Sequence, residues 1–218
     1  MSPRLLETMC AEGGAVALLD RHLARLAASA GVFGYPFDEP KTRAAVHAAV
    51  ARAVPAPVHR VRLTLGDGGE SGLSVEASPL VGGPFRTVWL CPDPLAEAGG
   101  PLCIHKTTDR EHYERPFREA RARGCDEAIL VNSRGEIVEG TRTSVWIYGG
   151  GQWLTSPLSA GGLAGVARAV LLETLPGAGE GRLTPADLET ADALFVCNAL
   201  RGLMPVVLVR ESARPPVE

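Results

Sequence analysis

Lysine is almost missing from this chain of 218 residues. Of its 22 basic residues, 20 are arginine, and only Lys41 and Lys106 are lysine. GC-rich coding, which favours arginine, alanine and glycine, accounts for the bias itself. A lysine amine changes its pKa readily when it is buried and can then act as a base or a nucleophile. Any chemistry of this protein that needs a lysine therefore has only two candidate residues.

Cysteine is scarce as well, and its distribution argues against two kinds of small fold. The cysteines are odd in number, widely spaced and mostly set in apolar segments, which predicts buried reduced thiols and no disulfide framework. No two cysteine or histidine residues stand at the spacing of zinc ligands, so we expect no metal site. The five cysteines are Cys10, Cys91, Cys103, Cys125 and Cys197.

Long apolar runs and excess charge are missing too. No apolar run approaches the roughly 20 residues that cross a bilayer, and the N-terminus has no basic segment followed by an apolar stretch. The net charge of −3 gives no reason to expect nucleic acid or a membrane surface as a partner. We therefore expect a cytoplasmic globular protein, long enough for one large domain or two small ones.

The first half of the chain shows alternating helix and strand patterns. Leu19, Leu23, Leu26 and Ala30 recur at spacings of four and three, which predicts an amphipathic helix up to Phe33. A hairpin around the turn residues 12–14 should precede it. The further predicted elements are a helix over residues 39–53 and strands over residues 59–65, 73–77 and 85–90.

A segment rich in proline and glycine, residues 92–101, follows these elements and predicts a linker. We therefore expect a small N-terminal α/β domain over residues 1–91 and a larger one over residues 102–218. In the second domain a short strand at 102–104 should lead to Lys106, and Pro116 suggests that the next helix begins near Arg115. The other predicted elements are strands at 128–131, 137–138, 144–148, 153–154, 193–197 and 206–209, and helices at 166–175 and from 184.

Three features of the second half could carry chemistry, although each is weak alone. Lys106 follows a buried segment, but most lysines are solvated surface charges. Glu139 ends a strand beside Gly140, where an exposed turn acid is the commoner explanation. The glycine-rich residues 161–165 precede a helix and could cradle a phosphate on backbone N–H groups, yet most such loops hold nothing.

The order of these features with several other motifs resembles the fold type IV pyridoxal-phosphate enzymes, the class IV aminotransferase-like family. The resemblance covers nearly the whole chain, from about residue 5 to residue 209. The motifs are residues 6–9 (LETM), 20–26 (DRHLARL), 105–110 (HKTTDR) with Tyr113, 124–132 (GCDEAILVN), 139–141 (EGT), 155–158 (TSPL), 162–168 (GLAGVAR) and 192–200 (DALFVCNAL).

The resemblance implies a mixed α/β fold of two domains, pyridoxal 5′-phosphate as cofactor, and a set of roles around it. Lys106 would bind the cofactor aldehyde covalently and then act as the proton-transferring base, helped by a pKa that burial lowers. Glu139 would hold the ring nitrogen protonated, and Arg25 would form a two-pronged hydrogen bond with the phosphate. The start of a helix would complete the phosphate site and Leu163 would pack on the ring. The residues at this helix start are Gly165, Val166 and Ala167.

The substrate side is less well defined by the resemblance. We expect Thr8, Tyr113 and Asn198 to line it, and Arg62 or Arg60 to meet a substrate carboxylate. Several positions depart from the usual family pattern, for instance Ala167, where a threonine is common in the phosphate site. These departures leave the lysine, the glutamate and Arg25 in place.

Within the family the HKTTDR motif is most similar to the 4-amino-4-deoxychorismate lyases, including those fused to the synthase that makes their substrate. The expected reaction converts 4-amino-4-deoxychorismate to 4-aminobenzoate and pyruvate, a step of folate precursor synthesis. The alternative is an aminotransferase acting on branched-chain or D-amino acids, and a further one is a non-catalytic partner subunit of a synthase. The resemblance also implies a homodimer.

Overall fold

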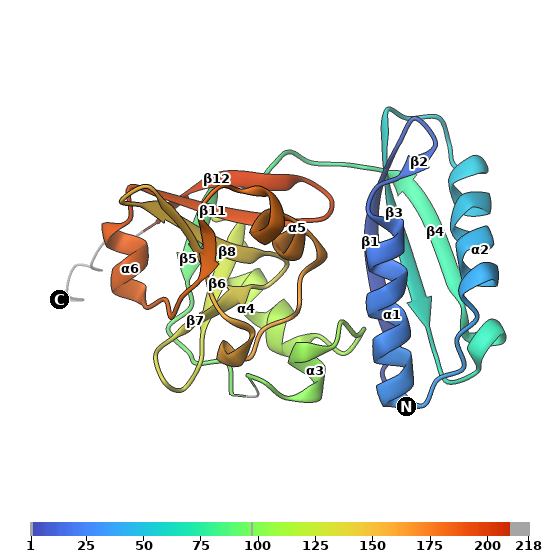
Figure 1. The fold of residues 1–218 in the computed structure, drawn as a ribbon, viewed down its shortest axis with the longest axis horizontal. Helices are drawn as coiled ribbons and strands as arrows, with labels where there is room; N and C mark the ends of the chain where they lie inside the picture. The colour runs from blue at the N-terminus through green and yellow to red at the C-terminus, as the bar shows by residue number, and fades with distance from the viewer. Residues whose placement is uncertain (1, 97, 210–218) are drawn as a thin grey trace.

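The computed structural model describes residues 2–96 and 98–209, which form two lobes (Figure 1). Each lobe is built on its own β-sheet, with helices packed against it. The first sheet has four strands in the order β2-β1-β3-β4, and the second has eight in the order β10-β9-β8-β11-β12-β5-β6-β7. The expected mixed α/β architecture is confirmed.

The N-terminal lobe is an antiparallel sheet with both helices on one face. Its strands are β1 (Leu5–Glu12), β2 (Ala15–Val16), β3 (Val58–Leu65) and β4 (Ser74–Pro79). Its helices are α1 (Leu19–Phe33), α2 (Glu39–Ala51) and the short η1 (Gly69–Gly72). The predicted hairpin and amphipathic helix are therefore present.

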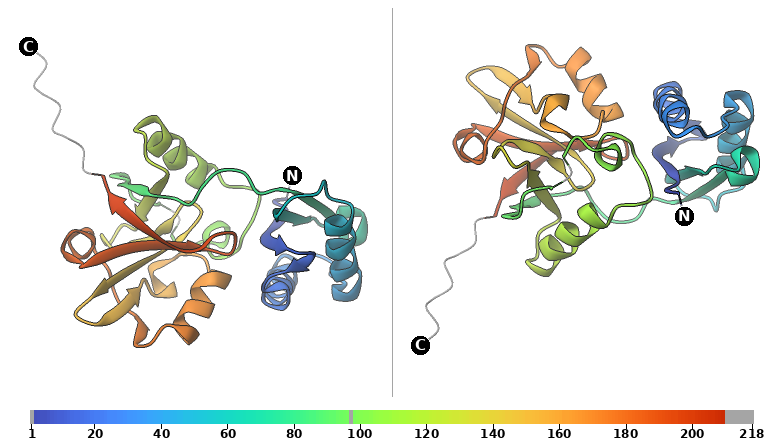
Figure 2. Two further views of the ribbon diagram at one scale, coloured as in Figure 1. Left: turned by 90° about the horizontal axis from the view of Figure 1, so that it is seen from above. Right: turned by 90° about the horizontal axis from the view of Figure 1, so that it is seen from below.

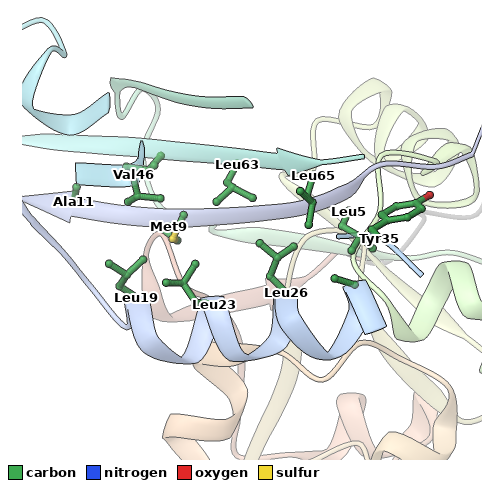
Figure 3. Close-up of a cluster of buried hydrophobic side chains, with 12 residues drawn as sticks. Leu5, Met9, Ala11, Leu19, Leu23, Leu26, Tyr35, Val46, Leu63 and Leu65 are labelled. Carbon is green, nitrogen blue, oxygen red and sulfur yellow. The ribbon is translucent and has the colours of Figure 1, made fainter. Parts of the chain in front are cut away.

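Alternation along the strands decides what the two faces of this sheet do. Leu5 and Met9 of β1 point to the helices and meet Leu23 and Leu26 of α1 in a buried core (Figure 3). Burial of each side chain of this size contributes about 1.5–3 kcal/mol to folding. The opposite face carries polar side chains from β1, β3 and β4 and is turned toward the other lobe.

The C-terminal lobe is a curved mixed sheet, in which β7 also contacts β8. Two helices lie on opposite sides of it, α4 (Glu111–Ala122) and α5 (Val166–Thr174), as Figure 2 shows from above and below. The strands are β5 (Thr87–Leu90), β6 (Glu127–Val131), β7 (Ile137–Gly140), β8 (Ser144–Gly149), β9 (Gln152–Thr155), β10 (Ala178–Glu180), β11 (Ala193–Asn198) and β12 (Gly202–Leu208). The remaining helices are α3 (Pro101–Ile104), η2 (Leu158–Ala160) and α6 (Pro185–Thr190).

The predicted position of the domain boundary is corrected by the strand pairing. β5 pairs in parallel with β6 and β12, so it belongs to the second sheet and not to the first lobe. The covalent connection between the two sheets is therefore residues 80–86, before the predicted linker. Residues 92–96 and 98–101 instead run along the second lobe, where Leu95 N donates to Val131 O at 2.7 Å and Gly99 N donates to Gly161 O at 2.8 Å.

Two predictions near Lys106 are also wrong. The segment predicted as a strand at 102–104 is the single-turn helix α3, which begins with Pro101 at a position where no N–H is needed. Helix α4 begins at Glu111, four residues before the predicted start, and contains Pro116. The short β10 was not predicted, because its sequence, Ala-Gly-Glu, has no strand pattern.

The two lobes are also tied together beside Lys106. Leu6 N of β1 donates to Lys106 O at 2.8 Å, and Thr108 N donates to Arg4 O at 2.8 Å. The loop that carries Lys106 therefore lies along the first strand of the N-terminal lobe. In the part of the chain that the structure describes, no helix is long and apolar enough to cross a membrane.

Candidate active site

A cavity of about 800 Å³ lies between the two lobes, and it collects every residue that the sequence singled out for the site. Its walls come from the polar face of the first sheet, from α1, and from the loops of the second lobe. The predicted residues that line it are Thr8, Arg25, Arg62, Lys106, Tyr113, Glu139, Leu163, Gly165, Val166, Ala167 and Asn198.

Lys106 lies in the loop between α3 and α4 and faces this cavity. Burial, reinforced by the positive charges of Arg110 and Arg25, lowers the pKa of its amine to about 7. A large fraction of the amine is therefore neutral at physiological pH and can attack a carbonyl carbon. The other lysine, Lys41, is exposed on α2 with its amine 3.8 Å from Asp38, so Lys106 is the lysine suited to chemistry.

Glu139 is the last residue but one of the buried strand β7, and the residue is only 7% exposed. Its Oε1 accepts a hydrogen bond from the Tyr113 hydroxyl at 2.5 Å and another from Leu163 N at 3.2 Å. Burial raises the pKa of Glu139 to about 7 against the lowering effect of these bonds and of Lys106. A carboxyl group held in this way can share a proton with a basic ring nitrogen.

The glycine-rich segment leads from Glu139 to the start of α5, where unpaired backbone N–H groups could receive an anion. Gly165 is the N-cap of α5 and has no side-chain cap, and the first N–H groups of a helix have no partner within the helix. Val166 and Ala167 begin that helix and line the cavity. A Cβ on Gly165 would lie 2.8 Å from Ser144 Oγ, so the close approach requires glycine. Backbone N–H groups at such a helix start attract a phosphate.

Arg25 of α1 reaches the same loop from the other lobe, where its Nη1 donates to Ala164 O at 3.0 Å. Its Nε and Nη2 donate to Glu7 at 2.8 and 2.6 Å. Burial acts to raise the pKa of Glu7, but the charge of Arg25 and the hydrogen bonds of His22 and Arg25 outweigh it and lower that pKa to about 2. Glu7 is therefore ionised and fixes the Arg25 side chain.

His22 completes this arrangement. Its Nδ1 lies 2.7 Å from Glu7 Oε2, while its buried Nε2 has no hydrogen-bond partner among the described residues. The ring also lines the cavity. A buried ring nitrogen without a partner indicates that a polar ligand or water belongs beside it.

Three predicted positions differ in detail from what we expected. Of the five N–H donors of the Arg25 guanidinium, two already bond to Glu7 and one to Ala164 O, so two are left for a phosphate. The Tyr113 hydroxyl bonds to Glu139 and is not free for substrate. Asn198 uses its Oδ1 to accept from Leu200 N and Arg201 N at 3.1 and 3.0 Å, and its Nδ2 reaches Arg142 O at 3.4 Å.

Sequence reasoning assigned no role to Glu7, His22, Glu127 or Arg110. Glu7 carried a signal that was available, because it stands between Leu5 and Met9 on the core-facing side of a strand, where a carboxylate is costly without partners. His22 and Arg25, three residues apart on one helix flank, are those partners. Glu127 and Arg110 gave no such signal, because their environment is set by contacts distant in sequence.

The donors of this cavity fit pyridoxal phosphate. A neutral amine matches the aldehyde, an acid matches the ring nitrogen, and the α5 start with Arg25 matches the phosphate. His22 Nε2, which has no hydrogen-bond partner among the described residues, belongs to a ring that lines the same cavity, so a polar group of a ligand has a place beside it. Among the residues that the structure describes, no group of three or more His, Cys, Asp or Glu side chains could hold a metal ion. The fold and the cavity together define a pyridoxal-phosphate enzyme.

A family model described as amino-transferase class IV matches residues 4–209. The chain therefore belongs to the class IV aminotransferase family, which is dependent on pyridoxal phosphate.

Solved structures agree on the fold and point to more than one activity. A protein from Mesorhizobium loti called a "putative amino-acid aminotransferase" is 36% identical, with a TM-score of 0.85 over 95% of this chain and 100% of that one. A protein called a "putative 4-amino-4-deoxychorismate lyase" is 28% identical, with a TM-score of 0.81 over 98% of this chain and 85% of that one.

Among curated proteins, the chain is similar to a "putative branched-chain-amino-acid aminotransferase" of Methanocaldococcus jannaschii. The two are 35% identical over 92 residues, which is 40% of this chain and 32% of that protein. The match thus spans about a third of the relative's length. The comparisons support a class IV enzyme and leave both lyase and aminotransferase chemistry open.

Proposed function

We propose that this chain is a lyase that converts 4-amino-4-deoxychorismate to 4-aminobenzoate and pyruvate. Membership of the family supports the cofactor and the chemistry of Lys106. The similarity to a protein called an aminodeoxychorismate lyase, and the HKTTDR motif around Lys106, support the substrate.

The observation that carries the proposal is the arginine-rich wall of the cavity. Arg60 and Arg62 project from β3, and Arg110 and Arg142 face them from the second lobe. Burial and the neighbouring charges of Arg60 and Arg110 lower the pKa of Arg62. Glu114 also lines this wall and offsets part of the charge, since it pairs with Arg142 at 3.0 Å and with Arg110 at 3.5 Å. The remaining positive charge, which lowers the pKa of Arg62, favours an anionic ligand. The proposed substrate carries two carboxylates, whereas a branched-chain side chain carries no charge.

The residues of the cavity divide the reaction between them. The bound cofactor supplies a carbonyl that takes up the substrate amine and a ring that accepts electrons. Lys106 Nζ removes the proton from the amine-bearing carbon, and Glu139 holds a proton at the ring nitrogen. The C–O bond to the enolpyruvyl group then breaks, the leaving group gains a proton to become pyruvate, and the carbocycle becomes aromatic.

A class IV aminotransferase acting on branched-chain or D-amino acids is the second candidate. The names of the curated relative and of the M. loti protein favour it. An aminotransferase needs a second substrate, an α-keto acid, to complete its cycle. A lyase acts on one substrate alone, so the two activities are separated by a single measurement.

That measurement is pyruvate release from purified 4-amino-4-deoxychorismate by the cofactor-loaded protein. We expect stoichiometric pyruvate and 4-aminobenzoate without any keto acid, and no release by Lys106→Ala. Absence of pyruvate together with efficient transamination of an amino acid would contradict the proposal and favour the second candidate.

A non-catalytic partner subunit is distinguished by the cofactor itself. Borohydride reduction followed by peptide mapping should label the peptide that contains Lys106. A protein that stays colourless with added cofactor would support the non-catalytic alternative. The family resemblance also leads us to propose a homodimer and a functional link to aminodeoxychorismate synthase, and the cytoplasmic location stays a prediction.

A further inference from the structure

Glu127, at the start of β6, is a carboxylate that the reaction above does not use. It is 0% exposed, and burial raises its pKa against the effect of its hydrogen bonds. Its contacts are all with donors. Oε1 accepts from Ala128 N at 2.8 Å, from Thr141 N at 3.1 Å and from the Thr141 hydroxyl, and Oε2 accepts from Arg142 N at 2.9 Å and the Thr143 hydroxyl at 3.1 Å.

Four of these five donors belong to one turn, residues 141–143, which follows Glu139 and lines the cavity. The turn is tight, because Gly140 N donates to Thr143 O at 2.8 Å and a Cβ at position 140 would overlap the Thr143 hydroxyl. Glu127 thus accepts from two N–H and two hydroxyl groups of the turn, and Thr141 N also donates to Ala128 O at 3.1 Å. The carbonyl groups of Thr141 and Arg142 accept from side chains outside the turn.

The carbonyl groups of this turn hold two side chains of the arginine-rich side of the cavity. Arg110 Nη2 donates to Thr141 O at 2.6 Å, and Asn198 Nδ2 reaches Arg142 O at 3.4 Å. The Arg110 guanidinium also lies 4.8 Å from the centre of the Tyr113 ring. Arg110 Nε also lies 3.5 Å from Glu114 Oε1 in an ion pair. The guanidinium is therefore held at the cavity wall by Thr141 O, by the Tyr113 ring and by Glu114, and its charge adds to the effect of burial in lowering the pKa of both Lys106 and Arg62.

We propose that Glu127 is a positioning residue for substrate recognition. By fixing the 141–143 turn it aims Arg110 at a carboxylate of the substrate and orients Asn198 beside it. The identity of that carboxylate rests on the proposed function. The arrangement that Glu127 imposes on Arg110 rests only on the contacts described above.

The test uses the cofactor-loaded protein and two probes, 4-aminobenzoate and aniline, which differ by one carboxylate. Calorimetry gives a Kd for each probe, and the ratio of the Kd of aniline to the Kd of 4-aminobenzoate measures the preference for the carboxylate. We expect the wild-type protein to prefer 4-aminobenzoate at least about tenfold, as one charged hydrogen bond supplies. Glu127→Gln replaces an acceptor by an amide that cannot satisfy the same donors, and it should remove most of this preference. Arg110→Met should do the same.

A matched control is Asp126→Asn. Asp126 also accepts backbone N–H groups, those of Arg86 at 2.9 Å and Thr87 at 3.2 Å, but it does not line the cavity. This variant should keep the preference.

In turnover, Glu127→Gln should raise KM about tenfold with little change in kcat, and the visible band and borohydride labelling at Lys106 should stay as in the wild type. If Glu127→Gln does not fold, Thr143→Val removes one bond to Glu127 and should reduce the ratio by a smaller factor.

A Glu127→Gln protein that keeps the wild-type ratio overturns the proposal, and so does equal weakening of both probes, which indicates a general loss of structure. A wild-type protein without any preference for 4-aminobenzoate overturns it as well. Loss of the preference in Glu127→Gln supports the proposal even where the wild-type protein releases no pyruvate. In that case the lyase function alone is rejected.

Discussion

Two groups with opposite charges titrate near neutrality inside one cavity. The pKa of Lys106 falls to about 7 and that of Glu139 rises to about 7, and in each case burial is the largest cause. Burial disfavours the charged form of either group. The same desolvated space therefore keeps a larger fraction of the lysine amine unprotonated, and a larger fraction of the carboxyl group protonated, near pH 7.

The pKa of Lys106 predicts how cofactor capture depends on pH. An amine whose pKa is lowered to about 7 is mostly protonated at about pH 6, with roughly one tenth neutral. The rate at which cofactor-free protein gains its visible band should therefore rise with pH through about 7 and level off near pH 8. Stopped-flow absorbance measures this rate.

Lys106→Ala should give no such band at any pH, which serves as the control for this measurement. A rate that continues to rise up to about pH 10 would contradict the assignment, because it is the behaviour of an ordinary solvated lysine.

Among single residues, the sequence predicted which side chains gather at the cavity better than it predicted which atoms they contact. Lys106, Glu139 and Arg25 were identified and lie at one cavity, but their roles stay predictions. A carboxylate on the core-facing side of β1 indicated that Glu7 needs partners, but it did not say which ones, because the pairing with Arg25 joins a strand and a helix that are apart in the sequence. The bonds between Glu127 and the 141–143 turn could not be predicted either, because Glu127 lies on the neighbouring strand and not within the turn.

Among the elements, the glycine-rich loop before α5 depends most on its backbone. Gly161 has a φ of +104°, a conformation that other residues avoid, and a Cβ there would lie 2.6 Å from the carbonyl carbon of Ala98. The loop and residues 98–99 are thus packed backbone against backbone, with Gly99 N bonded to Gly161 O at 2.8 Å.

We expect Gly161→Ala to destabilise the protein by about 2 kcal/mol or more, because both the φ angle and the contact must change. In a domain of this size that loss lowers Tm by roughly 4–8 °C. Gly83→Ala is the matched control, since a Cβ there meets nothing within 4 Å, and its Tm should stay within about 2 °C of wild type. Differential scanning calorimetry compares the two, and equal Tm values would count against the packing described.

Two of the elements that were predicted correctly have a strong apolar period. α1 and β3 carry clear repeats of 3.6 and 2 residues, and both lie where expected. α3 was misjudged because three apolar residues fit a strand and a single helical turn equally well. β5 was identified as a strand, but its parallel pairing with β6 and β12 is a long-range property, so the sequence placed it in the wrong lobe.

In the whole molecule, the cavity groups come from both lobes. Arg25 belongs to the first lobe, while Lys106, Glu139 and the α5 start belong to the second. A ligand that touches all of them couples the stability of the two lobes. The backbone hydrogen bonds between β1 and the Lys106 loop also couple the stability of the two lobes.

Cofactor binding should therefore raise the Tm of the whole molecule in a single transition. At a free concentration about 100 times Kd the gain is about 2.7 kcal/mol, which corresponds to roughly 5–10 °C. Arg25→Ala should show a smaller gain, because it weakens the contact from the first lobe. Two separate calorimetric transitions, of which only one responds to the cofactor, would show that the lobes are not coupled.

The bond from Leu6 N to Lys106 O has a consequence for how such a protein can change its specificity. Lys106 is bonded through main-chain atoms to β1, which pairs with β3, and the arginines of β3 line the same cavity. Side chains on β3 can therefore be exchanged over generations while the distance between the reacting amine and that surface stays the same. Substitutions on β3 can therefore alter substrate preference without moving the Lys106 amine.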